Sequence, residues 1–123
     1  MYARGLGVAE DYKEASRWFR LAAEQGTARA QNVLGVMYQS GLGVPANAVL
    51  AYALFSLSVA NSGSTQTSAT ENRDSIANTM SPEEIDSAQA LSLTLSNGSL
   101  NQAIDRYVQT EESELRVATY YSQ

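Results

Sequence analysis

The chain repeats itself at an interval of 36 residues, since Met1–Val8 aligns with Met37–Val44. Continuing at the same shift places Phe19 on Phe55, and nine of the 26 aligned residues are identical. A self-similarity of this period is typical of proteins built from stacked supersecondary units, in which each unit covers the apolar face of its neighbour. We therefore expect the 123 residues to form a short stack of units rather than one undivided core.

Apolar residues within each unit recur at helical spacing. The sequence predicts helices over about residues 12–25, 28–40 and 48–60, each with an apolar stripe along one side. Large apolar side chains on such a stripe are most often buried, so we expect the aromatic residues of the stripes to belong to the core. These residues are Trp18, Phe19 and Phe55.

Capping residues and glycines mark the ends of these helices. Asp11 and Asn47 are the expected N-caps of the first and third helices, because their side chains can accept a hydrogen bond from a free backbone N–H. Gly35 lies inside the second helix, where glycine costs up to about 1 kcal/mol relative to alanine, so we expect a neighbouring backbone to approach it closely. The glycines expected to serve turns or close packing are Gly5, Gly7, Gly26, Gly35, Gly41 and Gly43.

The second half of the chain carries helical signals without the repeat. Residues 62–68 are small and polar, which predicts a loop. The run Ser81-Pro82-Glu83-Glu84 predicts a helix start, because serine and glutamate can cap each other's backbone N–H groups and proline suits the first turn. Asn97-Gly98 is a helix stop. The helices expected here cover about residues 69–79, 82–96 and 100–109.

The repeated segments resemble the Sel1-like repeat. The residues that carry the resemblance are the helix end Leu34-Gly35-x-Met37-Tyr38, the turn Gly41-x-Gly43-Val44 and the helix end Ala22-Ala23-Glu24-Gln25-Gly26. The resemblance covers residues 1–61 and implies an all-α fold, in which antiparallel helix hairpins related to the tetratricopeptide repeat stack as a short right-handed α-solenoid. The helices that follow look like the degenerate hairpin found after such arrays in bacterial proteins.

The resemblance also suggests a division of the chain. We expect Sel1-like repeats over 1–61, a loop over 62–68, a degenerate terminal hairpin and capping helix over 69–110, and a helical or frayed tail over 111–123. The first repeat lacks most of its first helix. A longer repeat array or a second copy of the chain is therefore expected to cover the open face, and self-association through the incomplete N-terminal repeat is one alternative.

Composition excludes much chemistry. The chain has no cysteine and no histidine, which removes zinc sites and most nucleophile or acid/base pairs, so we expect no enzyme activity, metal or cofactor. A net charge of −5 disfavours nucleic acid, and the sequence contains no apolar run long enough to span a membrane. The compartment stays open between the cytoplasm and, if a signal peptide lies upstream, the periplasm. Glu83, Glu84 and Asp86 lie at the start of a predicted helix, where carboxylates stabilise the helix dipole.

The expected function is that of a non-enzymatic interaction module or adaptor. The resemblance implies that the first helix of each unit lines a concave surface that binds another protein or peptide. A second face of helix 28–40, away from its buried stripe, then supplies the candidate binding residues, namely Arg29, Asn32, Val36 and Ser40. One alternative is a structural end segment of a larger scaffold. A lesser one is a hydrolase, because some family members act on β-lactams, but those are rich in cysteine.

Overall fold

The computed structural model describes the backbone of residues 7–63 and 68–121, with side chains over 11–63 and 68–114. Six helices and no strand occur in these ranges, which confirms the all-α prediction. The helices are α1 (Gly7–Glu24), α2 (Ala28–Ser40), α3 (Ala48–Ser62), α4 (Ser68–Ala77), α5 (Pro82–Ser96) and α6 (Leu100–Tyr121). None of the helices in the described part of the chain is long and apolar enough to cross a membrane.

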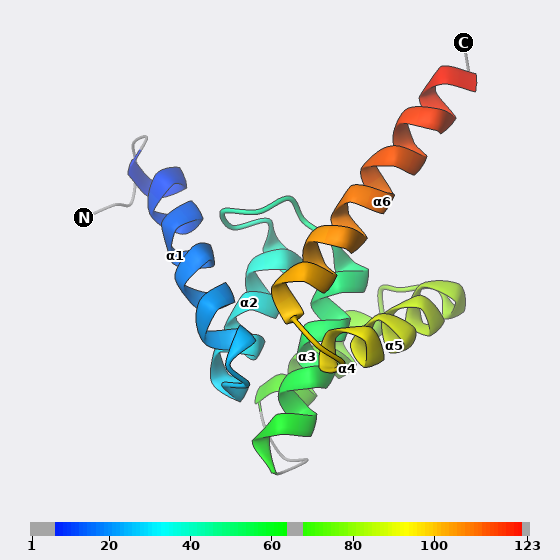
Figure 1. The fold of residues 1–123 in the computed structure, drawn as a ribbon. Coiled ribbons are helices and arrows are strands. Elements are labelled where there is room, and N and C mark those ends of the chain that lie inside the picture. The colour runs from blue at the N-terminus through cyan, green and yellow to red at the C-terminus, as the bar shows by residue number, and fades with distance from the viewer. Residues whose placement is uncertain (1–6, 64–67, 122–123) are drawn as a thin grey trace.

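The helices pack around α3. Helix α3 contacts α2, α4 and α5, while α1 packs on α2. Helix α6 begins between α1 and α5, contacts both, and its C-terminal end projects beyond the other helices (Figure 1). The centre of the core lies between α2 and α3, where Leu34, Leu50, Leu54 and Phe55 are fully buried.

Local capping signals fix several helix ends as predicted. The Asn47 side chain accepts a hydrogen bond from the Leu50 N–H at 2.9 Å, and so caps α3. At α5 the Ser81 hydroxyl accepts from the Glu84 N–H, and the Glu84 carboxylate accepts from the Ser81 N–H, which completes a capping box. Pro82 occupies the first turn of this helix.

Helix α1 begins five residues before the predicted start, so the prediction of Asp11 as its N-cap is wrong. In the second repeat Pro45 keeps the preceding residue out of the helical region, and α3 starts only after Asn47. The first repeat has Ala9 at the equivalent position, which allows the helix to extend back to Gly7. Gly7 is therefore part of a helix rather than of the expected turn, and Gly5 lies outside the described residues.

Two glycines mark close contacts between helices. A Cβ atom on Gly35 would lie 2.5 Å from Cε1 of the Phe55 ring and 3.3 Å from the Ala51 carbonyl oxygen. The nearest neighbour is thus an aromatic ring on α3, whereas a backbone was expected. A Cβ on Gly43, whose φ is 78°, would overlap the backbone carbonyl of Tyr12, so the α2–α3 loop packs directly on the α1 backbone.

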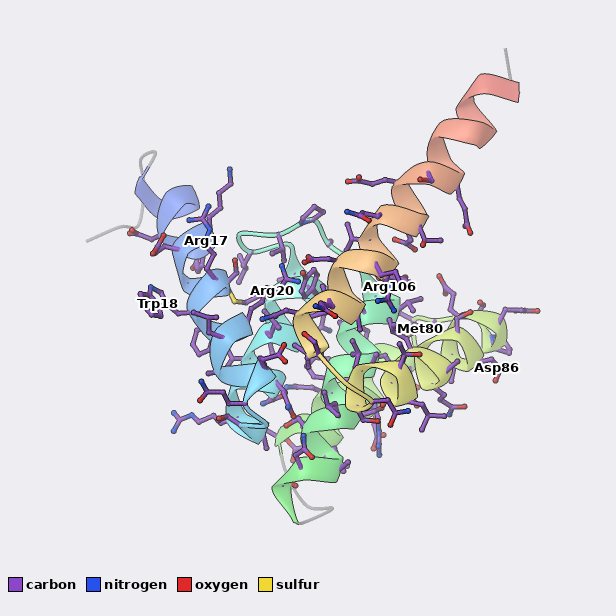
Figure 2. All side chains as sticks on the ribbon, in the orientation of Figure 1. Arg17, Trp18, Arg20, Met80, Asp86 and Arg106 are labelled. Atoms are coloured by element: carbon purple, nitrogen blue, oxygen red, sulfur yellow. The ribbon has the colours of Figure 1, made fainter. Side chains whose placement is uncertain are left out.

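The prediction that Trp18 belongs to the core is wrong. Trp18 is 64% exposed and points away from the other helices (Figure 2). Phe19 is partly buried, and Phe55 is fully buried as expected. Leu54, which occupies the position equivalent to Trp18 in the second repeat, is fully buried. The difference arises because α3 lies among three other helices, whereas the described part of the chain leaves the outer side of α1 open.

Candidate interaction groove

A groove of about 830 Å3 lies between α6, the loop that joins α2 to α3, and the C-terminal half of α1. Apolar side chains from two of these elements line it, namely Val44 and Pro45 of the loop and Ile104 and Val108 of α6. Most of the remaining lining is polar or charged and includes Arg20 of α1. The groove therefore combines apolar contact area with charged groups, as binding sites generally do.

Helix α1 holds the first turns of α6 in place. Arg20 of α1 reaches towards α6 (Figure 2), where its Nη2 donates to the Asp105 carboxylate at 2.7 Å and to the Asn101 carbonyl at 3.0 Å. Glu24, also on α1, accepts hydrogen bonds from the Asn101 N–H at 2.7 Å and from the Ser99 hydroxyl at 3.2 Å. A carboxylate at a helix N-terminus interacts favourably with the helix dipole, so Glu24 acts as a cap supplied by another helix.

The α2–α3 loop binds α6 further along the helix than α1 does. Asn47 Nδ2 donates to one oxygen of Glu111 at 2.7 Å, and the Tyr107 hydroxyl donates to the other at 2.8 Å. Asn47 therefore has two roles, since its Oδ1 caps α3 while its amide nitrogen binds α6. Burial raises the pKa of Tyr107, and the hydrogen bond to Glu111 raises it further, so the hydroxyl stays a donor over the physiological pH range.

Tyr38 lies at the end of α2 and contributes a largely buried aromatic side chain to the groove. Burial raises its pKa, while the positive charge of Arg20 lowers it and the negative charge of Asp105 raises it. Because burial is the largest of these influences and raises the pKa, the Tyr38 hydroxyl also remains protonated near neutral pH. The groove walls thus come from α1, α2, the loop and α6, all of which are joined by direct hydrogen bonds or close packing.

The predicted binding stripe on α2 lies elsewhere and is not a continuous surface. Arg29 and Ser40 are exposed near opposite ends of the helix. Between them, Asn32 accepts a hydrogen bond from Asn72 of α4 at 3.0 Å, and Val36 packs against the core. Helix α4 therefore lies against the middle of this stripe. The role of these four residues in binding stays a prediction.

No local sequence pattern indicates the groove. Three of its acidic residues lie in the stretch 111–123, which the sequence predicts to be a helical or frayed tail. The contact that forms it joins Arg20 to Asp105, which are 85 positions apart in the chain. Tyr107 and Glu111 are spaced by four residues, which indicates contact on a helix but not which element they face. Among the described residues, no group of three or more candidate ligands is placed to hold a metal ion.

The family model of the Sel1 repeat matches residues 1–27 and 28–62. The chain belongs to the Sel1 repeat family. Sel1 repeats generally mediate contacts between proteins, and the family is typically non-enzymatic. The two matched repeats supply α1, α2 and α3, whereas α6 lies outside the match. A search of curated proteins found no match to the chain. The groove is therefore formed between the Sel1 repeats and a helix that the repeat pattern does not describe.

Proposed function

We propose that this chain is a protein-interaction module that binds a segment of a partner protein in the groove between α6 and the α2–α3 loop. The observation that carries the proposal is the groove itself, with about 830 Å3 of space, apolar lining and charged groups. The family's general role in protein contacts supports the same conclusion. A volume of about 300–1,000 Å3 is enough to enclose several side chains of a bound segment.

The fixed position of α6 favours binding in this groove. Arg20 and Glu24 of α1 bind its first turns. Asn47 of the α2–α3 loop binds Glu111 further along the helix. A surface that is ordered before binding loses less conformational entropy when the partner arrives, so more of the contact energy becomes affinity. Binding by shape and side-chain complementarity requires no chemical step.

A peptide-display experiment tests the proposal. Random displayed peptides are selected for binding to the folded chain, and their affinity is then measured for two variants. Gln109→Trp places a bulky ring in the groove lining, and Gln102→Trp makes the same change at an exposed position of α6 outside it. We expect selected peptides to lose at least about tenfold in affinity for Gln109→Trp and to keep their affinity for Gln102→Trp. Peptides that bind both variants equally well would contradict a role for the groove.

The same selection tests the stripe predicted on α2. Peptides that are lost on Arg29→Glu but retained on Gln109→Trp would assign binding to the α2 face rather than to the groove. Arg29 is exposed, so this substitution is not expected to disturb folding.

Self-association through α1 is a second candidate, favoured by exposed apolar side chains on that helix. Trp18 is 64% and Leu21 is 53% exposed, while their equivalents in the second repeat, Leu54 and Leu57, are buried. A second copy of the chain would cover this face, and light scattering should then show a mass that rises with concentration and falls in Trp18→Ser. Leu93→Ser, at an exposed apolar residue of α5, is the control. A mass that does not change with concentration would rule this candidate out.

A further inference from the structure

The groove is strongly acidic. Four carboxylates line it, namely Asp105, Glu111, Glu112 and Glu114, and Arg20 is the one cation among the described residues of its lining. Arg20 is already engaged, because its Nη2 lies 2.7 Å from the Asp105 carboxylate. Beside this ion pair, Glu111 and Glu114 add further negative charge to the groove.

The hydrogen bonds around Glu111 do not neutralise it. Its two oxygens accept from the amide of Asn47 and from the hydroxyl of Tyr107, both of which are uncharged donors. These bonds fix the carboxylate at the groove but leave its charge in place. The environment of Tyr107 is consistent with this, since the negative charges of Glu111 and Glu114 add to burial and hydrogen bonding in raising its pKa.

Apolar surface adjoins these carboxylates. Val108 lies one turn before Glu111 and Glu112 on α6, and Val44 and Pro45 face the groove from the loop. Lysine and arginine combine an apolar stem with a cationic head, so they can pack the stem on apolar surface while the head meets a carboxylate. Complementary charge also speeds the encounter of two proteins and disfavours partners of the same sign.

We infer that the groove selects a partner segment that carries lysine or arginine side chains next to apolar ones. This inference rests on the proposed function and specifies the chemistry of the partner. An acidic segment would be repelled by the negative charges of Glu111 and Glu114, and a purely apolar one would remove water from these carboxylates without offering a cation in its place. A segment with basic and apolar side chains can contact both the carboxylates and the apolar side chains of the lining.

Peptides selected on the folded chain, and confirmed to lose binding to Gln109→Trp, provide the probe. We expect them to be rich in lysine or arginine interspersed with apolar residues. Their affinity should fall when sodium chloride is raised from about 50 to about 300 mM, because salt screens attraction between exposed charges. Versions with glutamate in place of each basic residue should not bind.

Substitutions that remove a single negative charge show which carboxylates attract a basic peptide. Glu111→Gln and Glu114→Gln keep the shape of the side chains, and each should weaken a basic peptide by about two- to fivefold. Glu83→Gln removes the same charge from an exposed position at the start of α5, away from the groove, and should leave affinity unchanged. Circular dichroism of each variant checks that the fold is kept.

The two ideas fail in different ways. Groove-binding peptides that lack basic residues, or whose affinity is insensitive to salt and to both glutamine substitutions, would overturn the inference about charge while leaving the groove as the binding site. Equal weakening by Glu83→Gln would also overturn it, because the effect would then reflect overall charge. Selected peptides that ignore Gln109→Trp would instead refute the proposed function.

Discussion

Replacing Gly35 by alanine tests whether close packing of α2 on α3 is the reason for a glycine inside a helix. A Cβ at this position would lie 2.5 Å and 2.7 Å from two ring carbons of Phe55, whose side chain is fully buried. Overpacking of this kind destabilises by about 1–3 kcal/mol, while alanine gains about 1 kcal/mol over glycine in helix propensity. Because the overlap involves a rigid buried ring, we take the upper part of the first range and expect a net loss of about 1–2 kcal/mol in the free energy of unfolding.

Urea unfolding followed by circular dichroism measures this loss, and a double-mutant cycle assigns it. Phe55→Leu removes ring atoms opposite residue 35, so Gly35→Ala should be less destabilising in that background by at least about 0.5 kcal/mol. Gly35→Leu should destabilise more than Gly35→Ala in the original chain. An unchanged or increased stability of Gly35→Ala, or a cycle without coupling, would refute close packing as the reason for this glycine.

Three further predictions concern stability. Leu54→Ala should lower the free energy of unfolding by about 2–5 kcal/mol, whereas Trp18→Ala, at the equivalent but exposed position, should change it by less than about 1 kcal/mol in the monomer, as urea titration would show. Ser81→Ala should cost about 1 kcal/mol, measured in the same way, because α5 loses its capping box. The raised pKa values of Tyr38 and Tyr107 mean that the unfolded chain releases these protons first, so stability should fall as pH rises above 10; a smaller fall in Tyr107→Phe would confirm the contribution of that residue.

Predictions that depend on neighbouring residues in the sequence were the accurate ones. The caps at Asn47 and Ser81 and the bounds of α2 and α5 follow from interactions within three or four positions, which the sequence displays directly. The predicted start of α1 was wrong, although the sequence shows why α1 starts early. Ala9 stands where the second repeat has Pro45, so no proline prevents the helix from extending back to Gly7. Helix α6 continues to Tyr121, so the stretch after residue 109, which local sequence leaves open as helical or frayed, is helical up to that residue.

Burial was predicted less well, because periodicity shows which residues share a helix face but not whether another helix covers it. Trp18 and Leu54 occupy the same position of the repeat, yet one is 64% exposed and the other fully buried. The number of helices packed around each position decides whether its side chain is buried. The stripe from Arg29 to Ser40 was affected in the same way, since α4 approaches Asn32 at its middle.

The sequence by itself determined the period of the repeat, the family, the helical class and most helix ends, because each of these is encoded in local spacing and in capping residues. The tertiary structure alone decided where α6 lies, and with it the groove. Arg20 meets Asp105, and Asn47 meets Glu111, across 85 and 64 positions of the chain. No local pattern specifies such contacts, since they arise only when the repeats and α6 have folded against each other. The acidic residues of α6 thereby come to line a groove beside apolar side chains.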